Sequence, residues 1–353
     1  MTIKALLESF AEWRARAEPL VLASVYETAG STYSKAGARM LIAGGGRFQG
    51  MLSGGCLEGD LALRAEAVLA SGTPGAVTYD LGRNDEGLWG LGVGCDGLMR
   101  IFLQPLSQER DYQPFTAMAK FLSGDRPGMA ATVIESLHPV LAPGATLVGI
   151  ESDWAAFGIP DDCRGQFERA AARAERDGRS VARTVDIAGQ DLQVLFARLV
   201  PPPRILVLGA GLDAEPVVRF ADELGWRVTV QDHRPAYIAN GKFAGAELIL
   251  CEPAESVAER LPLDRYDAVI VMSHHLDTDR KYLAQLADCR IPYIGLLGPP
   301  NRRARLLAEL GPQATGLAHR LHGPAGFDIG ADGPASIALS IVAEMVAERK
   351  GSA

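Results

Sequence analysis

One cysteine of the chain follows a pair of glycines and directly precedes a segment with the periodicity of a helix. The glycines, Gly54 and Gly55, permit backbone angles that expose N–H groups, and Cys56 comes next. A thiol at the beginning of a helix has a lowered pKa, because the thiolate meets the positive end of the helix dipole. We therefore interpret Cys56 as a reactive or ligand-binding sulfur. The alternative is a small buried residue in a tight turn, where Glu58 only complements the helix start.

Two further loops in the same half of the chain carry groups that could contact a ligand. The loop at residues 30–37 is bounded by glycines, and it offers the hydroxyl groups of Ser31 and Ser34 and the cation of Lys35. A later glycine-dense loop contains Cys95. This second thiol is either a further sulfur ligand, or a partner for the first cysteine, or a packed residue of the loop.

The second half of the chain contains the pattern of a dinucleotide-binding turn. An apolar strand at residues 204–208 runs into Gly209 and Gly211, and Ala214 completes the spacing G-x-G-x-x-A at the start of a helix. The glycines allow a tight turn and a close approach of a pyrophosphate, which the helix N-terminus stabilises. Asp232 ends the next strand, where an acid usually accepts a hydrogen bond from a ribose 2′-hydroxyl. The turn predicts a site for NAD or another nucleotide; the alternative is a domain that keeps this shape and binds neither.

Other polar residues have less support for a functional role. His274 and His275 follow a predicted strand at the sheet edge where α/β proteins bind ligands, but adjacent histidines rarely point at one ion. Asp277 and Asp279 can be helix caps, so we predict no metal site. Arg234 can meet a 2′-phosphate or face water. We expect a solvated helix face or simple packing for the remaining candidates, which are Arg302, Arg303, Arg305, His319, His322, Cys163, Cys251 and Cys289.

Three consecutive prolines at residues 201–203 divide the chain, because they fit neither a helix interior nor a central strand. Beyond this linker, helical segments alternate with buried strands, which we expect at residues 204–208, 226–230, 247–251, 267–272 and 292–297. The alternation predicts a Rossmann-like, doubly wound parallel sheet for residues 204–353.

Before the linker, residues 1–200 have the mixed pattern of a separate α/β domain. We expect helices at residues 6–17, 57–70 and 166–176. Strands are expected at residues 20–26, 39–43, 48–52, 76–81, 98–103, 130–135 and 146–150. The pattern leaves the order of these strands open.

The composition excludes several classes of protein. The 353 residues are 48% hydrophobic, which is enough for more than one core. A net charge of −8 argues against broad binding to nucleic acid. We expect a cytoplasmic protein with no membrane span, because no apolar run approaches about 20 residues and the N-terminus lacks the features of a signal peptide. The five cysteines are too far apart for a disulfide framework or a zinc pattern.

Taken together, these stretches resemble the XdhC/CoxI family, which are accessory proteins of molybdenum hydroxylases such as xanthine dehydrogenase and carbon monoxide dehydrogenase. The resemblance covers nearly the whole chain. It rests on the runs G-S-T-Y-S-K-A-G-A-R-M at 30–40, S-G-G-C-L-E at 53–58, G-C-D-G at 94–97, G-A-G at 209–211, Y-I-G-L-L-G at 293–298, G-F-D-I-G-A at 326–331 and I-A-L-S-I at 337–341. The cysteine-bearing S-G-G-C-x-E motif looks like the CoxI branch.

The resemblance implies a maturation factor rather than a metabolic enzyme. Members bind the molybdenum cofactor, hold it while a cysteine desulfurase helps to install its terminal sulfur, and assist its insertion into a molybdenum hydroxylase; a homodimer is also implied. A pterin dithiolene with a phosphate or nucleotide tail needs N–H donors, hydroxyls and a cation, and a soft thiolate suits molybdenum. The implied sulfur ligands are Cys56 and Cys95, and the implied cofactor-binding residues are Ser31, Ser34, Lys35, Ser53, Gly54, Gly55, Glu58, Gly209, Gly211 and Asp232.

The function of the chain is open to three interpretations. In the first, the Rossmann-like domain holds the nucleotide tail of a cytosine-dinucleotide form of the cofactor. In the second, the chain is an NAD(P)-dependent oxidoreductase that uses Gly209, Gly211 and Asp232. A third reading is a scaffold that docks a desulfurase to its client and binds no cofactor. The oxidoreductase gives no reason for the loop at residues 53–58.

Overall fold

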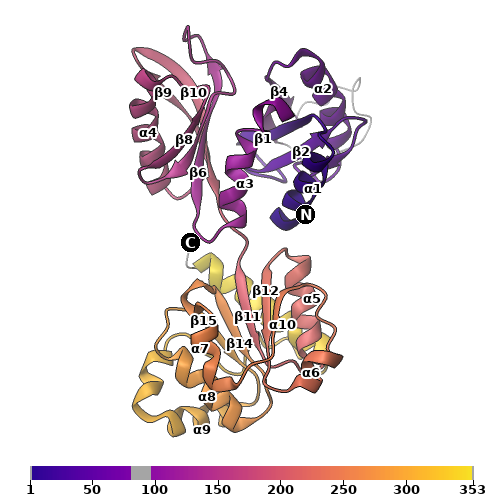
Figure 1. Ribbon diagram of the computed structural model, residues 1–353, viewed down its shortest axis with the longest axis vertical. Helices are drawn as coiled ribbons and strands as arrows, with labels where there is room; N and C mark the ends of the chain where they lie inside the picture. Colours follow the sequence, from indigo (N-terminus) through magenta and orange to yellow (C-terminus); the bar gives the residue numbers. More distant parts are fainter. Residues whose placement is uncertain (1, 81–96, 352–353) are drawn as a thin grey trace. The chain divides into compact units, whose positions relative to one another are not determined.

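The computed structural model describes residues 2–80 and 97–351 of the chain (Figure 1). The chain divides into two compact units, Met1–Pro201 and Pro202–Ala353, and the division falls within the three prolines. The buried apolar residues of each unit form clusters of their own.

The N-terminal unit begins with an antiparallel sheet of five strands in the order β3-β2-β1-β5-β4. The centre of the sheet is β1, whose residues from Leu20 to Tyr26 are all buried. The strands are β1 (Leu20–Ala29), β2 (Arg39–Ala43), β3 (Phe48–Gln49), β4 (Gly75–Asp80) and β5 (Leu98–Leu106).

Helix α2 (Glu58–Ser71) covers one face of this sheet. Its buried side chains recur three or four residues apart, as in Leu61, Ala65 and Val68, and they pack with residues of β1, β2 and β5. The helix ends at Gly72, which has a left-handed backbone (φ 65°) that a residue without a Cβ atom adopts easily. The helix therefore has a fixed start beside the cysteine loop and a fixed end.

A second antiparallel sheet completes the N-terminal unit, in the order β8-β7-β6-β10-β9. Helix α4 (Asp161–Arg176) packs on this sheet through Cys163, Phe167 and Ala171 (Figure 1). The strands are β6 (Gly128–Ser136), β7 (Thr146–Ile150), β8 (Asp153–Phe157), β9 (Val181–Ile187) and β10 (Gln190–Leu199).

An aromatic cluster joins the two sheets of this unit. It contains Phe10 of α1 (Ile3–Ala15) and Phe115 of α3 (Phe115–Ser123), whose ring centroids lie 4.7 Å apart, together with residues of both sheets. The short helix η1 (Gln108–Arg110) leads into α3. The two sheets and their helices are thus one folded body.

The C-terminal unit is built on six parallel strands in the order β13-β12-β11-β14-β15-β16. From β13 the chain crosses back over β12 and β11 to reach β14, so the strand order reverses between β11 and β14. Sheets of this kind bind ligands at the carboxyl ends of the two strands where the order reverses. The strands are β11 (Arg204–Leu208), β12 (Arg227–Gln231), β13 (Ala246–Leu250), β14 (Ala268–Val271), β15 (Tyr293–Leu296) and β16 (Leu321–His322).

Helices cover both faces of the parallel sheet. One core cluster contains residues of α5 and α10, and a second contains residues of α7, α8 and α9. The helices are α5 (Ala214–Glu223), α6 (Pro235–Asn240), α7 (Val257–Arg260), α8 (Leu276–Leu286), α9 (Pro300–Leu310) and α10 (Pro334–Gly351), with short turns η2 (Ala254–Ser256), η3 (Leu263–Arg265) and η4 (Gly311–Leu317). The predicted fold class is confirmed. No described helix has the length and apolar character needed to span a membrane.

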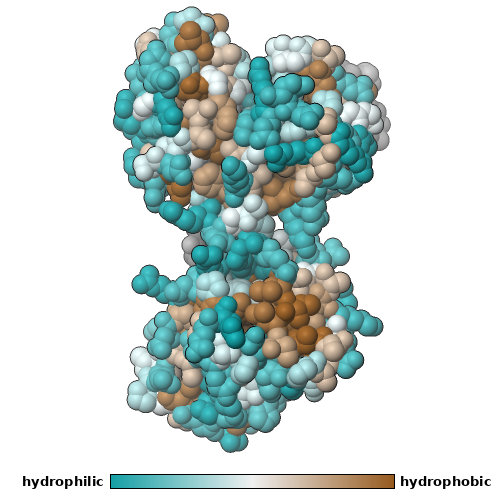
Figure 2. Space-filling view, in the orientation of Figure 1, coloured by the Kyte–Doolittle hydropathy of each residue, from teal (hydrophilic) through white to brown (hydrophobic). Residues whose placement is uncertain are grey.

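The prediction of a buried strand at residues 247–251 is wrong. The strand forms, but it is the edge of the sheet, and Leu248 and Ile249 are 41% and 43% exposed. Figure 2 shows a hydrophobic area at the place where Figure 1 labels the neighbouring strand β12. Cys251 follows this edge and is exposed, so its predicted packing role is also wrong, whereas Cys163 is buried and Cys289 half-buried.

Candidate functional site

The loop before α2 is folded around the carboxylate of Glu58. This side chain is 2% exposed and accepts hydrogen bonds from the backbone N–H groups of Leu52 (2.8 Å), Ser53 (2.9 Å) and Gly55 (3.0 Å), and from the Ser53 hydroxyl. Burial opposes ionisation, but the hydrogen bonds from Ser53 and Leu52 outweigh it, and the pKa of Glu58 lies below its ordinary value. The ionised carboxylate holds the shape of the loop and makes no outward contact.

Cys56 is held at the start of α2 by the same network. The Ser53 hydroxyl accepts a hydrogen bond from the Leu57 N–H (2.8 Å), and the half-buried Cys56 thiol donates to the Ser53 carbonyl oxygen (3.4 Å). Within the described residues, the backbone N–H groups of Gly54 and Cys56 have no hydrogen-bond acceptor. The loop therefore places a partly accessible sulfur beside two N–H donors that no acceptor in the described part of the chain engages.

The loop at residues 30–37 lies against the cysteine loop. The buried Ser34 hydroxyl donates to the Met51 carbonyl oxygen (3.4 Å), and a Cβ atom at Gly54 would lie 3.3 Å from the Tyr33 ring. Ser31 and Lys35 are exposed, and the Lys35 ammonium donates to the Thr32 hydroxyl (3.4 Å). The structure thus places the loop at residues 30–37, which carries these hydroxyls and this cation, against the loop that carries Cys56.

Gly97 packs against the loop at residues 30–37. The contact is so close that a Cβ atom at Gly97 would collide with the Ser31 carbonyl oxygen. Cys95 precedes it by two residues in the sequence and falls in residues 81–96, outside the described residues. The predicted role of Cys95 therefore stays a prediction.

In the C-terminal unit, the predicted glycine-rich turn follows β11. Gly209 has φ 123°, and a Cβ atom there would lie 2.5 Å from the Met272 carbonyl oxygen, so only glycine lets the turn approach β14 this closely. Ala214 is fully buried where α5 begins. These residues form the strand, turn and helix of a Rossmann fold.

Asp232 is placed differently from a ribose-binding acid. Its carboxylate is 0% exposed and accepts hydrogen bonds from the Ala210 N–H (2.7 Å), the Arg234 N–H (2.9 Å) and the Arg234 guanidinium (2.6 and 2.9 Å). Burial opposes ionisation, but Arg234 and the Ala210 N–H lower the pKa of Asp232 overall. A ribose hydroxyl would have to displace one of these donors. Arg234 lies over the Tyr237 ring, 3.7 Å from its centroid.

A second carboxylate stands at the start of α5. Asp213 precedes the first helical residue, and its oxygen lies 2.6 Å from Nε2 of His274. His274 has a left-handed backbone (φ 61°), which is uncommon for a residue with a side chain. Because the Asp213 carboxylate occupies the helix end that favours anions, it opposes a phosphate there.

The other polar candidates have structural partners. His275 caps α8 by accepting from the Thr278 N–H, and the buried Asp279 pairs with Arg302 (2.6 Å). Arg280 and Lys281 lower the pKa of Asp277 to about 2. Arg305 pairs with Glu309. No cluster of three or more potential metal ligands occurs among the described residues.

Sequence reasoning missed two pairings that shape these sites. The Asp213–His274 pair joins residues 61 positions apart, and the sequence has no local signal for it. Glu344 of α10 is a second case: it accepts from the Tyr293 hydroxyl (2.5 Å) and the Gly326 N–H (2.8 Å), and His322 lies 3.3 Å away. Burial raises the pKa of Tyr293. This network holds the backbone at Gly326, and His322 is one of its members.

Comparison with known proteins identifies the family. Two family descriptions match, XdhC Rossmann domain over residues 205–345 and XdhC and CoxI family over residues 13–80. A Bacillus subtilis protein, named as a probable xanthine dehydrogenase subunit, is 31% identical over 94% of this chain and 94% of its own. An uncharacterized protein of Escherichia coli, YqeB, is 25% identical over 70% of this chain and 46% of its own.

A solved structure agrees with these matches. The crystal structure of a xanthine dehydrogenase from Bacillus halodurans has a TM-score of 0.82 and 28% identity, and the match covers 99% of this chain and 96% of that one. On this evidence, the chain belongs to the XdhC and CoxI family.

Proposed function

We propose that this protein is an accessory factor that binds the molybdenum cofactor, supports its sulfuration and assists its insertion into a molybdenum hydroxylase. The observation that carries the proposal is the Cys56 thiol, held half-buried beside the N–H groups of Gly54 and Cys56, which have no acceptor among residues 2–80 and 97–351. Family membership and the relative named for xanthine dehydrogenase support the same class of client.

The groups at this site match the chemistry of the proposed cargo. A molybdenum centre and its terminal sulfur are soft, so a thiolate suits either ligation or a sulfur hand-off. Backbone N–H donors, the Ser31 hydroxyl and the Lys35 ammonium suit pterin and phosphate oxygens. Glu58 would act through the shape of the loop, since its carboxylate is already fully engaged. In this proposal Cys95 is a second sulfur ligand.

A nucleotide tail of the cofactor would bind at the C-terminal unit. The Gly209 turn and the start of α5 are the elements that accept a pyrophosphate in this fold. In a Gly211→Arg variant we expect weaker binding of the cytosine-dinucleotide form and unchanged binding of the mononucleotide form. Equal affinity of the variant and the wild type for the dinucleotide form would contradict this assignment.

The alternative of an NAD(P)-dependent oxidoreductase has less support. Asp232 has no exposed surface and its oxygens are taken by Ala210 and Arg234, so the usual acceptor for a ribose hydroxyl is occupied.

The experiment that tests the proposal is direct binding of isolated molybdenum cofactor to the full chain. We expect stoichiometric binding by the wild type and its loss in Cys56→Ala. A Cys251→Ala variant is the matched control, because it removes an exposed thiol from the other unit and should bind like the wild type. Absence of binding by the wild type would contradict the proposal and favour a docking scaffold or an oxidoreductase. A homodimer and a cysteine desulfurase partner are further parts of the proposal.

A further inference from the structure

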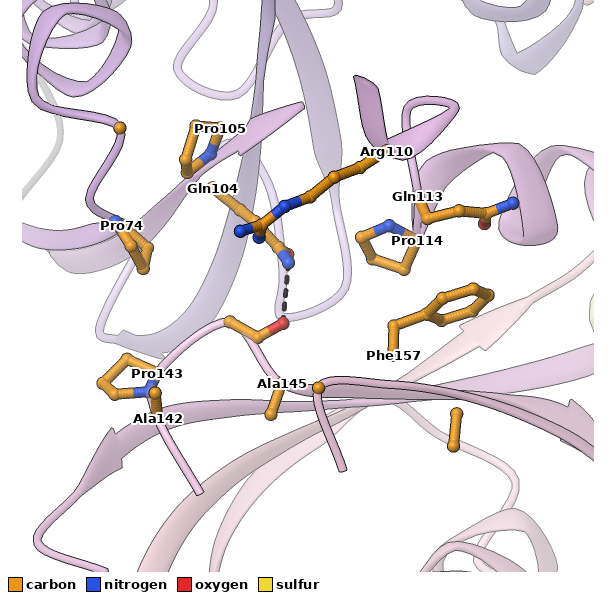
Figure 3. Close-up of a pocket in the computed structure, with 14 residues that line it drawn as sticks. Pro74, Gln104, Pro105, Arg110, Gln113, Pro114, Ala142, Pro143, Ala145 and Phe157 are labelled. Carbon is orange, nitrogen blue, oxygen red and sulfur yellow. Dashed lines mark hydrogen bonds between the residues drawn. The ribbon is translucent and has the colours of Figure 1, made fainter. Parts of the chain in front are cut away.

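The N-terminal unit contains a cavity of about 590 Å³ between its two sheets. It is bounded by the end of β5, the turn after η1, the connection from β6 to β7 and the end of β8 (Figure 3). Cavities of this size hold small organic ligands in other proteins. None of the residues assigned above to cofactor binding lines it.

One cation lines this cavity, and it has no partner among the residues that the structure describes. Within the described residues, the Arg110 guanidinium makes no hydrogen bond or ion pair. Its two acidic neighbours are engaged elsewhere: Glu109 with the Ser107 hydroxyl, and Asp111 with Arg14 at 2.6 Å. Figure 3 shows the Arg110 side chain extending across the cavity towards Gln104.

The backbone on the carboxyl side of the exposed Arg110 forms a defined turn. Asp111 and Tyr112 follow it with left-handed backbones (φ 49° and 54°), which cost energy in residues with side chains. The turn is fixed by hydrogen bonds from the Tyr112 N–H to the Ser107 carbonyl (2.8 Å) and from the Thr116 hydroxyl to the Asp111 carbonyl (2.6 Å). The cation is therefore presented from a rigid turn.

Besides the amides of Gln104 and Gln113, the lining of the cavity contains the rings of four prolines and of Phe157. Phe157 and Pro114 lie on one side of the Arg110 side chain, and Pro74 and Pro143 lie on the other (Figure 3). None of the described residues that line the cavity carries a carboxylate. Rings of proline and phenylalanine offer flat apolar surfaces that suit another ring, and an unpaired guanidinium suits a carboxylate.

The cavity is separate from the cysteine loop. Gly72, at the carboxyl end of α2, lines the cavity, whereas Cys56 stands just before the amino end of the same helix. The 14 residues of α2 span about 20 Å at the rise of an α-helix. A ligand in the cavity would not touch the thiol.

We propose that this cavity binds a small ring-bearing carboxylate, whose carboxylate pairs with Arg110 and whose ring packs on Phe157 and the prolines. The site goes beyond the proposed cofactor function, because it lies at the opposite end of α2. The Gln104 side chain, 7% exposed and donating to the Gly144 carbonyl (2.7 Å), fixes the wall opposite the turn.

Calorimetric titration of the full chain with three probes tests the proposal. Benzoate carries the ring and the charge, benzamide carries the ring alone, and inorganic phosphate carries charge alone. We expect saturable binding of benzoate, weakened about 10-fold or more in Arg110→Gln, because a charge-assisted pair is lost. An Ala142→Trp variant, which fills the exposed rim, should also lose benzoate binding. The matched control is Arg126→Gln, which removes an exposed arginine that does not line the cavity.

Three results would overturn the proposal. The first is no saturable binding of benzoate by the wild type. The second is equal benzoate affinity in Arg110→Gln and Arg126→Gln, or in Ala142→Trp and the wild type. The third is Arg110-dependent binding of phosphate as tight as that of benzoate, which would indicate an anion site with no role for the ring.

Discussion

At the scale of single residues, buried or half-buried carboxylates hold the glycine-containing turns in place. Glu58 accepts the N–H groups of the loop before α2, Asp232 accepts the Ala210 N–H of the turn after β11, and Glu344 accepts the Gly326 N–H. Hydrogen bonds to an ionised acceptor are about twice as strong as neutral ones, so a single side chain can define a loop with few other contacts. The groups available to a ligand are those that these carboxylates do not engage, such as the Cys56 thiol.

Replacing Glu58 by glutamine should destabilise the N-terminal unit. The neutral amide oxygen accepts more weakly than a carboxylate oxygen. The amide NH2 group, a donor, then faces one of the loop N–H groups, and the unmade hydrogen bond lowers the free energy of unfolding by about 1–3 kcal/mol. Urea unfolding at neutral pH measures the loss. Glu66→Gln on the exposed face of the same helix is the control and should change little. Equal stability of the two variants would contradict the role given to Glu58.

The effect of Glu58 should also depend on pH. Its folded-state pKa is lowered, so its stabilisation is complete above the unfolded-state pKa of about 4.3 and disappears as the pH falls through the folded value. The difference in unfolding free energy between wild type and Glu58→Gln should therefore shrink as the pH falls below about 4. A difference that grows under acid would show that the carboxylate is protonated in the folded protein.

Removing the charge of Asp213 should strengthen nucleotide binding by the C-terminal unit. In Asp213→Asn, a phosphate no longer meets a carboxylate at the start of α5, and we expect about a 2- to 5-fold gain in affinity for cytidine diphosphate. Fluorescence or calorimetric titration measures it. The control is Asp288→Asn. Asp288 is an exposed acid between the end of α8 and the amino end of β15. Unchanged or weaker binding in Asp213→Asn would show that the phosphate does not lie there.

Sequence reasoning identified the residues of the cysteine loop but not what each does. It placed Cys56 at a helix start, as found, because paired glycines before a helical period are a local pattern. It grouped Glu58 with the ligand-binding residues, whereas the carboxylate binds the loop itself. A glutamate that accepts from the backbone and a glutamate that binds a ligand are the same residue type, so the sequence does not distinguish the two roles. The structure distinguishes them by the hydrogen bonds of the carboxylate.

At the scale of elements, α2 positions the cysteine loop over the first sheet. Leu61 is fully buried in the core shared with β1, β2 and β5, while Leu63 on the same helix is 68% exposed. The orientation of the helix start therefore depends on packing more than one turn away from the thiol.

Leu61→Ala should destabilise the N-terminal unit by about 2–5 kcal/mol, because it leaves a cavity under the helix. Leu63→Ala, with the same change of side chain at an exposed position, should cost less than about 0.5 kcal/mol. Chemical unfolding of both variants measures the difference. Similar losses in the two would contradict the packing of α2 described here.

The elements of the C-terminal unit were easier to predict than those of the N-terminal unit. Parallel strands buried on both faces read as short apolar runs, and β11 was placed correctly for that reason. Strand β9 was missed, since it lies at a sheet edge and six of its seven residues are half-buried or exposed in no regular alternation. The pairing of β1 with β5 joins residues about 70 to 90 positions apart, which no local pattern specifies.

At the scale of the whole molecule, the chain has two units with separate cores. The clusters that contain residues of α5 and α8 include only residues beyond Pro202, and those of the two antiparallel sheets include only residues before it. We therefore expect a fragment of residues 202–353 to fold alone, with cooperative thermal unfolding by circular dichroism. A fragment without a cooperative transition would show that its core needs the other unit.

The most direct test of the central claim is protection of the Cys56 thiol by the cofactor. The full wild-type chain is treated with N-ethylmaleimide with and without molybdenum cofactor, and modification of each cysteine is followed by peptide mass spectrometry. The exposed Cys251 serves as an internal control in the same sample. We predict that the cofactor slows modification of Cys56 and leaves Cys251 unchanged. Equal rates at Cys56 with and without the cofactor would contradict the account.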